Sequence, residues 1–204
     1  MLRRQGRMHP EIAAFPNRMF YAREQLMPVP LPHQEDHSVA HRILFFPSPY
    51  CKMEGHGSQV NIAEAKIVCE QLIKVFHDYG PAFDPVKTVG VIVPYRNQIA
   101  VIRREIEASG IDALMQVSID TVERYQGSQR DVIIYSFTIQ NRYQLEFLTA
   151  NCFVEDGKVI DRKLNVVLTR ARKQLILTGN EEVLRFNRLY ALLLDDIKKR
   201  GGYA

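Results

Sequence analysis

The sequence predicts an α/β fold in which a parallel β-sheet is flanked by helices on both faces, in three layers. Short segments rich in β-branched or aromatic residues are apolar almost throughout, which is typical of strands buried on both faces. Helical patterns separate these segments, and this alternation favours parallel pairing. The strands are predicted at 43–46, 89–93, 117–119, 132–137 and 175–177.

Three helices are predicted between and after these strands. Asn61 followed by Glu64 forms a capping box for a helix that runs to about residue 78. A second helix follows Pro94, where isoleucines recur at spacings of three and four. A third begins after Asn180 and continues to about residue 200, with acidic residues in its first turn and basic residues in its last, as the helix dipole favours.

One globular domain is expected to account for the whole chain, 1–204. Its 204 residues are 46% hydrophobic and 25% charged, which is enough for a sizeable core. Residues 1–42 are expected to contribute an N-terminal helix and a connecting loop. Pro10 suits the first turn of that helix, and residues 29–41 are rich in proline and polar side chains, as in an exposed loop.

Charge and cysteine usage narrow the classes of function. The formal net charge of +4 and the pI of about 9.0 slightly favour an anionic partner. Cys51, Cys69 and Cys152 are odd in number and widely spaced, which indicates buried thiols in a reducing compartment. No apolar stretch approaches the roughly 18 to 20 residues that span a bilayer. We therefore expect an intracellular protein of the cytoplasm, or of the nucleus in a eukaryote, with no membrane partner.

Four polar clusters stand at the ends of the predicted elements. They are QGRMHPEI at 5–12, VIVPYRNQ at 91–98, TVERYQGSQRDVIIYS at 121–136 and DRKLNVVLTRARK at 161–173. Taken singly, each has a structural explanation: a solvated arginine, a helix start, a loop between strands and a basic helix face. Because ligands of open α/β sheets bind outside the carboxyl ends of the strands, we expect the chemistry in the loops that follow them.

Taken together and in this order, the clusters resemble the motifs of the second RecA-like domain of superfamily 1 helicases, in the group of the Upf and Dna2 helicases. Members carry a leucine, two variable residues and Gln-Tyr-Arg-Met-His-Pro, matched by Leu2 and by 5–10 except at Gly6. Motif IV resembles 91–95, motif V resembles 121–131 and motif VI resembles 162–172. The resemblance covers nearly the whole chain, and four ordered motifs are more specific than any one of them.

The resemblance implies roles for individual residues. Arg7 and Arg170 are expected to reach across an interdomain cleft to the γ-phosphate of ATP, because arginine keeps its charge and presents a fork of donors to phosphate oxygens. Arg172 is left with a structural role. The residues expected near the nucleotide are Gln5, Gly127 and Gln129, and those expected along a single nucleic-acid strand are Pro94, Tyr95, Thr121 and Gln126.

Three positions depart from the family pattern. Gly6 replaces the tyrosine that stacks on adenine, which weakens base recognition by this domain. Gln129 replaces an acidic residue, so a ribose contact there is weaker. Val93 stands where motif IV often has threonine, which removes a hydroxyl.

The phosphate-binding pattern GxxxxGK[ST] and its acidic partner motif do not occur in the chain. The resemblance therefore implies the C-terminal motor half of an ATP-dependent DNA or RNA helicase that moves 5′ to 3′. ATP and Mg²⁺ would be held mostly by a separate N-terminal RecA-like domain, and no metal ligand is assigned here. We expect a fragment or separately expressed domain that is inactive alone.

Other functions remain open at this point. The chain could be a stand-alone module that binds single-stranded nucleic acid without ATPase activity. The triplet Glu64-Ala65-Lys66 suggests a metal-dependent nuclease, but it falls in a predicted helix rather than a strand. His33, His37 and His41 are spaced four apart, which on a helix would align three metal ligands, although their segment reads as a loop.

Overall fold

The computed structural model describes residues 4–21, 26–51, 59–155 and 157–204, so Leu2 of the N-terminal motif lies outside the described residues. A five-stranded sheet forms its centre, in the order β3-β9-β6-β4-β5, and every pairing in it is parallel. This confirms the predicted fold class. The strands are β3 Ile43–Pro47, β4 Val89–Val93, β5 Ser118–Thr121, β6 Arg130–Ser136 and β9 Ala171–Gly179.

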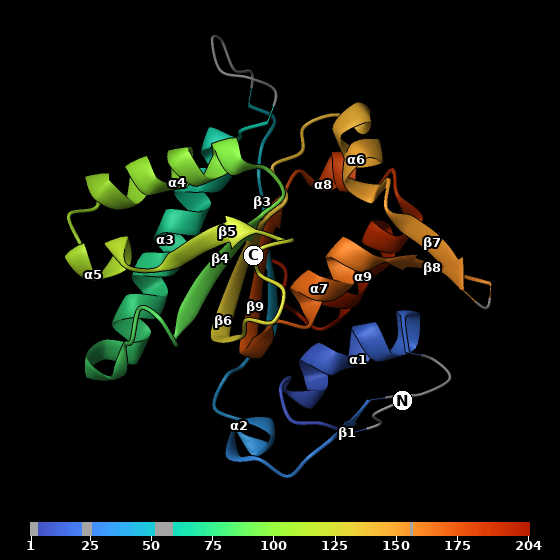
Figure 1. The fold of residues 1–204 in the computed structure, drawn as a ribbon, viewed down its shortest axis with the longest axis horizontal. Coiled ribbons are helices and arrows are strands. Elements are labelled where there is room, and N and C mark those ends of the chain that lie inside the picture. Colours follow the sequence, from blue (N-terminus) through green and yellow to red (C-terminus); the bar gives the residue numbers. More distant parts are fainter. Residues whose placement is uncertain (1–3, 22–25, 52–58, 156) are drawn as a thin grey trace.

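Helices cover both faces of this sheet and give three layers (Figure 1). One face carries α3 Ile62–Tyr79, α4 Arg96–Ala108 and α5 Asp112–Met115, with a short 3₁₀ turn at Gly80–Ala82. The other face carries α1 Pro10–Met19, α6 Arg142–Thr149, α7 Arg162–Leu168, α8 Glu181–Leu184 and α9 Arg188–Lys199. Each face has its own apolar core, and the central strands contribute side chains to both cores. This two-sided burial explains why the strands read as continuous apolar runs.

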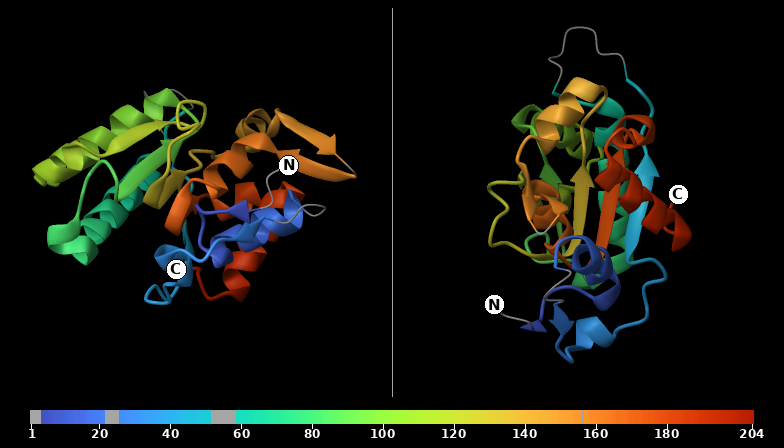
Figure 2. Two further views of the ribbon diagram at one scale, coloured as in Figure 1. Left: turned by 60° about the horizontal axis from the view of Figure 1, so that its bottom comes forward. Right: turned by 90° about the vertical axis from the view of Figure 1, so that its right-hand side faces the viewer.

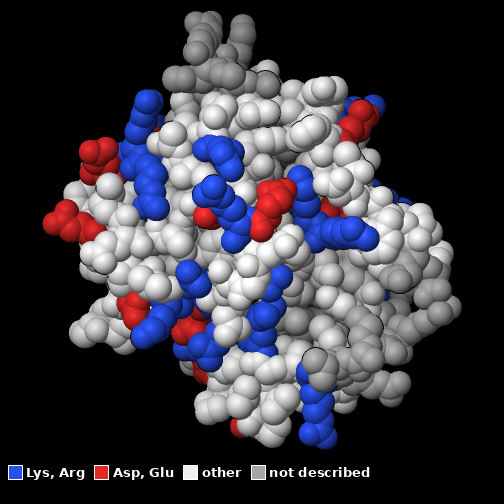
Figure 3. Space-filling view, viewed as in Figure 1, with Lys and Arg blue, Asp and Glu red and all other residues white. Residues whose placement is uncertain are grey.

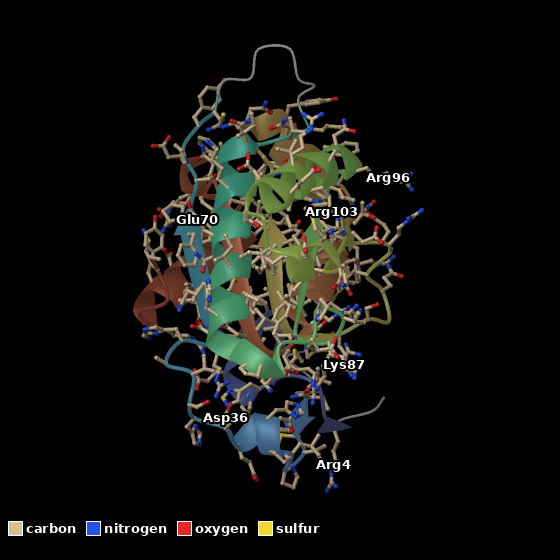
Figure 4. The ribbon with its side chains drawn as sticks, turned by 90° about the vertical axis from the view of Figure 1, so that its left-hand side faces the viewer. Arg4, Asp36, Glu70, Lys87, Arg96 and Arg103 are labelled. Carbon is tan, nitrogen blue, oxygen red and sulfur yellow. The ribbon has the colours of Figure 1, made fainter. Side chains whose placement is uncertain are left out.

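The strands all point the same way, which gives the sheet two chemically different edges. In the right-hand view of Figure 2 the arrows point toward α6, whereas α1 and the short helix α2 (Pro32–Glu35) lie at the opposite end. Figure 4 shows α3 and α4 side by side on one face, with Lys87, which precedes β4, and Arg96, which follows it, at opposite ends. We call these ends the amino edge and the carboxyl edge.

Several elements differ from the sequence-based expectation. The single helix expected after Asn180 is two helices, because Asn187 caps α9 by accepting from the Leu189 N–H at 2.9 Å. The strand expected at 175–177 runs from 171 to 179. The segment expected as an exposed loop contains α2, in which His33 and Gln34 are buried.

Two small pairs of strands were not predicted. A two-residue parallel pair joins β1 Arg4–Gln5 to β2 Met27–Pro28, and an antiparallel hairpin joins β7 Cys152–Glu155 to β8 Lys158–Asp161. Helices α6 and α7 were also missed, because each is at most eight residues long and has too few turns to show a helical period. None of the described helices is both long enough and apolar enough to cross a membrane.

A buried carboxylate joins the elements at the carboxyl edge. Asn61 caps α3 by accepting from the Glu64 N–H at 3.1 Å, as expected, whereas its backbone N–H donates to the Gln98 side-chain oxygen at 2.8 Å. The Glu64 carboxylate accepts from the Asn61 side-chain amide at 3.0 Å, from the Ser136 hydroxyl at 2.6 Å and from the Thr138 N–H at 2.7 Å. Glu64 therefore links the start of α3 to the end of β6 and has no place in a nuclease site.

Burial makes the charge on Glu64 costly. It raises the pKa of Glu64 to about 7, although hydrogen bonds from Ser136 and Thr138 favour the ionised form. The folded state therefore holds this proton at pH values where the unfolded chain, with an ordinary pKa of 4.5, has released it. The contribution of Glu64 to the free energy of unfolding is therefore fully present below about pH 4.5 and is lost as the pH rises through about 7.

We predict that the free energy of unfolding falls with pH in the wild-type chain but falls less in Glu64→Gln. The pKa difference corresponds to about 3 kcal/mol between pH 4.5 and 8, and a neutral amide cannot lose that proton. Chemical denaturation of both proteins across this range measures the difference. A difference in stability that does not change with pH would contradict the prediction.

Candidate nucleotide and nucleic-acid site

The predicted site residues fall into two groups at opposite edges of the sheet. Arg170 directly precedes β9 and Gln129 directly precedes β6, so both lie at the amino edge. Tyr95 follows β4 and Thr121 ends β5, so both lie at the carboxyl edge. The first group thus precedes its strands, whereas the chemistry was expected in the loops that follow strands. Those residues enter the sheet rather than leave it.

Arg7 lies across the starts of β6 and β9. Its Nε donates to the Gln129 side-chain oxygen at 3.2 Å, and its Nη1 donates to the Thr169 carbonyl at 3.1 Å. Both partners are neutral, so they orient the guanidinium without cancelling its charge. Among the described residues, no carboxylate forms an ion pair with Arg7.

Arg170 lies in the turn between α7 and β9. Its carbonyl accepts from the Arg130 N–H at 3.2 Å, and its own N–H donates to the Val167 carbonyl at 3.2 Å, which fixes its backbone. Its buried Nε has no hydrogen-bond partner among the described residues. Burial lowers the pKa of Arg170, and the positive charge of Arg7 lowers it further. Two guanidinium groups thus lie close together with no described countercharge, an arrangement that attracts an anion.

Arg7 sits in a short loop that is held by amide side chains. The Gln5 side-chain oxygen accepts from the N–H groups of Arg7 and Met8 at 3.0 and 2.8 Å. Its amide donates to the Met8 carbonyl at 2.9 Å. Gln34 of α2 donates to that same carbonyl at 2.8 Å. Gln5, predicted to lie near a nucleotide, here shapes the loop that carries Arg7.

The segment 122–129 joins the two edges. Gly127 is exposed and adopts a φ of 85°, and a Cβ there would meet no atom within 4 Å. The segment is anchored by Tyr125, whose hydroxyl lies 2.8 Å from that of Ser118. A Cβ at Gly90 of β4 would overlap the Tyr125 hydroxyl, so glycine is required there while Tyr125 keeps this position. This anchor holds Gln129 beside Arg7.

Arg172 differs from Arg170 although only one residue separates them. Its Nη1 forms an ion pair with Asp131 at 3.2 Å, and Lys173 pairs with the other oxygen of Asp131 at 2.7 Å. The structural role expected for Arg172 agrees with this contact. Of the two arginines in this stretch, only Arg170 lacks a described carboxylate partner.

The carboxyl edge presents a different surface from the one expected. The Tyr95 ring is only 7% exposed and stacks on Phe147 of α6, with 6.3 Å between ring centroids. Thr121 is also 7% exposed. A nucleic-acid strand passing this edge would therefore meet Phe147, which is 57% exposed, and Tyr143, which is 78% exposed, before it met Tyr95. These two aromatic residues were missed, and their spacing of four in NRYQLEFL is the signal that could have identified them.

Basic residues accompany this surface. Arg96 begins α4 directly after Tyr95 and points outward at the carboxyl edge (Figure 4). Figure 3 shows that Lys and Arg side chains predominate across the middle of the face seen in Figure 1. Gln126 lines a hollow of about 460 Å³ together with Arg162 and Phe153. The Arg162 guanidinium lies 4.6 Å from the centre of the Phe153 ring.

The structure gives no support to a histidine metal site. His33 is buried and its ring nitrogens contact Arg7 and Arg172. His37 instead packs edge-on against His9, with 6.3 Å between ring centroids. In the part of the chain that the structure describes, no three His, Cys, Asp or Glu side chains gather as metal ligands.

Comparison with known proteins identifies the family of the chain. The family model AAA_12, described as an AAA domain, matches residues 1–182. The chain is 28% identical to the probable helicase MAGATAMA 3 of Arabidopsis thaliana, over 98% of this chain and 24% of that protein. It is 29% identical to helicase sen1 of Schizosaccharomyces pombe, over 96% of this chain and 11% of that protein.

Two further matches concern a regulatory protein and a solved structure. Identity to regulator of nonsense transcripts 1 of Dictyostelium discoideum is 30%, over 96% of this chain and 15% of that protein. The chain thus spans a quarter or less of the length of these relatives. The crystal structure of the C-terminal domain of a possible DNA helicase from a Lactobacillus shares the fold, with a TM-score of 0.50 and 16% identity over 91% of this chain and 96% of that one. The chain belongs to the AAA_12 family and is the second RecA-like domain of a superfamily 1 helicase of the Upf and Dna2 group.

Proposed function

We propose that residues 1–204 form one motor domain, the C-terminal half of an ATP-dependent helicase, and that Arg7 and Arg170 act on the γ-phosphate of ATP. The observation that carries this proposal is the pair of arginines at the amino edge with no described carboxylate partner. A pair of like charges is unfavourable unless an anion joins it. Phosphate oxygens match both the charge and the forked donors of the two guanidinium groups.

Catalysis would need a second domain. The residues here can stabilise negative charge on a phosphoryl group, but the described chain has no metal-ligand cluster and the sequence has no phosphate-binding loop. ATP supplies the phosphoryl group, and Mg²⁺ would be held by the N-terminal RecA-like domain. Neutral partners hold Arg7 in place before substrate arrives, so little reorganisation is needed as charge develops.

The segment 122–129 connects the residues proposed to contact the nucleotide with those proposed to contact the nucleic acid. Thr121, the last residue of β5, directly precedes it at the carboxyl edge, and Gln129 ends it in contact with Arg7. Movement of Arg7 toward a phosphate would displace Gln129, and through the segment it would displace the carboxyl edge that contacts the nucleic acid. Opening and closing of the cleft between the two domains would then move their nucleic-acid contacts relative to each other. The protein would advance along the nucleic acid in the 5′ to 3′ direction of the family.

The substrate is proposed to be a single strand of DNA or RNA. Exposed Tyr143 and Phe147 offer stacking surfaces that tolerate any base. We propose that Pro94, Tyr95 and Thr121, at the ends of β4 and β5, and Gln126 of the following segment also contact this strand. Cys51, Cys69 and Cys152 are unpaired, which fits a reducing compartment inside the cell. Gln126 and Gly127 lie in the segment that connects these nucleic-acid contacts to the arginine pair at the amino edge.

A second function, binding of a single strand without ATP turnover, is favoured by the same aromatic residues. They lie at the opposite edge from the arginine pair and do not depend on it. Binding by the 204-residue chain alone is therefore expected under either function. Only the response of the full-length protein to changes at Arg7 and Arg170 separates them.

We predict that Arg170→Ala or Arg7→Ala lowers kcat for ATP hydrolysis by the full-length protein about 10³-fold or more, because an arginine that contacts the γ-phosphate contributes about 10³ to 10⁵ in rate. Nucleic-acid affinity should hardly change. Steady-state ATPase assays with saturating single strand measure the effect, and Arg104→Ala, an exposed arginine of α4, is the matched control.

The same assay on the 204-residue chain should give no turnover above a buffer blank. Turnover that disappears in Arg170→Ala would contradict the requirement for a second domain. A full-length protein whose kcat is unchanged in both arginine variants would contradict the proposed function itself.

We predict that Phe147→Ala and Tyr143→Ala each weaken binding of a single strand by roughly 5- to 150-fold, since stacking of a base on an aromatic ring contributes about 1–3 kcal/mol. Fluorescence anisotropy with labelled oligonucleotides measures the affinity. Val86→Ala, an equally exposed apolar residue near the amino edge, is the control. Equal affinity in all four proteins would exclude stacking at this edge.

A further inference from the structure

His33 of α2 is buried against the loop that carries Arg7, although 26 residues separate the two. Its Nε2 lies 2.9 Å from the Arg7 carbonyl oxygen, and its Nδ1 lies 3.4 Å from Nη2 of Arg172. A carbonyl can only accept and a guanidinium can only donate. The ring therefore satisfies both partners only as a neutral imidazole with its proton on Nε2.

Arg172 is itself held in place. Its Nη1 pairs with Asp131 at 3.2 Å, and its carbonyl accepts from the His9 N–H at 2.9 Å. Asp131 lies in β6, at the amino edge of the sheet. A continuous series of contacts thus runs from β6 through Asp131, Arg172 and His33 to the backbone of Arg7.

We propose that His33 is a positioning residue for Arg7. Gln129 and the Thr169 carbonyl orient the tip of the Arg7 side chain, whereas His33 fixes its backbone. Gln34 of the same helix holds the neighbouring carbonyls of Gln5 and Met8 at 3.1 and 2.8 Å. Helix α2 therefore fastens the loop to the sheet, and His33 connects it to the ion pair of Arg172. This inference rests on the proposed role of Arg7 in ATP hydrolysis.

Two substitutions at His33 test its contact with Arg7 and its contact with Arg172 separately. In His33→Gln the longer amide reaches the Arg7 carbonyl and keeps that hydrogen bond. In His33→Asn the shorter side chain can still accept from Arg172 but does not reach Arg7. We expect His33→Asn to lower kcat of the full-length ATPase about tenfold, the scale of one lost hydrogen bond that orients a catalytic group, and His33→Gln to stay within about threefold of wild type.

A merely structural role would not divide the effect in this way. KM for ATP, affinity for a single strand and the unfolding midpoint should be nearly the same in both variants, with His77→Asn, an exposed histidine of α3, as the control. Equal kcat in the Asn and Gln variants would overturn the proposal. So would a parallel loss of strand affinity or stability in His33→Asn.

A spectroscopic test is independent of ATP hydrolysis. In ¹⁵N NMR of the imidazole in the 204-residue chain, His33 should give the signals of the neutral form protonated at Nε2. A ring protonated at Nδ1 would overturn the proposal. If Arg7→Ala and Arg170→Ala leave kcat unchanged, the proposed function fails; if they abolish activity while His33→Asn does not, only the role of His33 fails.

Discussion

The pairing of β6 with β9 at the centre of the sheet determines where the site forms. Arg130 of β6 pairs with Ala171 of β9, so Gln129 and Arg170 enter the sheet side by side. The register then shifts, and Asp131 meets Arg172 and Lys173 as ion pairs. Arg170, one residue before β9 begins, has no described carboxylate opposite it. One strand register thus neutralises the second arginine of the stretch and leaves the first available to an anion.

The neutral partner of Arg7 has an electrostatic consequence. A carboxylate at residue 129 would pair with Arg7 and offset part of the charge that attracts phosphate, whereas the Gln129 amide accepts the same hydrogen bond and leaves the charge intact. The cost is repulsion between Arg7 and Arg170, which adds to burial in lowering the pKa of Arg170. The Gln5 and Gln34 hydrogen bonds hold the loop in place against that repulsion.

Short-range patterns in the sequence predicted the strands and the long helices because each carries enough turns or apolar residues to show a period. They could not predict that Gln129 and Arg170 lie side by side, since this depends on the pairing of β6 with β9, which are far apart in sequence. Tyr95 was expected as a nucleic-acid contact from the family resemblance, but its burial under Phe147 depends on α6, a helix too short to predict. The role of α2 was missed because Pro-rich segments usually lie exposed.

Under the proposed function, the segment 122–129 offers a short connection between the two edges of the sheet. Because α-helices cover the faces, a signal between the arginine pair and the strand-binding edge must pass through the core or through a segment that spans the sheet. Residues 122–129 are such a segment, and Tyr125, packed where only glycine fits at residue 90, acts as a fixed point in its middle. A displacement of Gln129 with Arg7 would therefore turn the segment about Tyr125 rather than shift it as a whole. Its other end, next to Thr121, would move in response. This movement would couple contact with the phosphate at the amino edge to contact with the nucleic acid at the carboxyl edge.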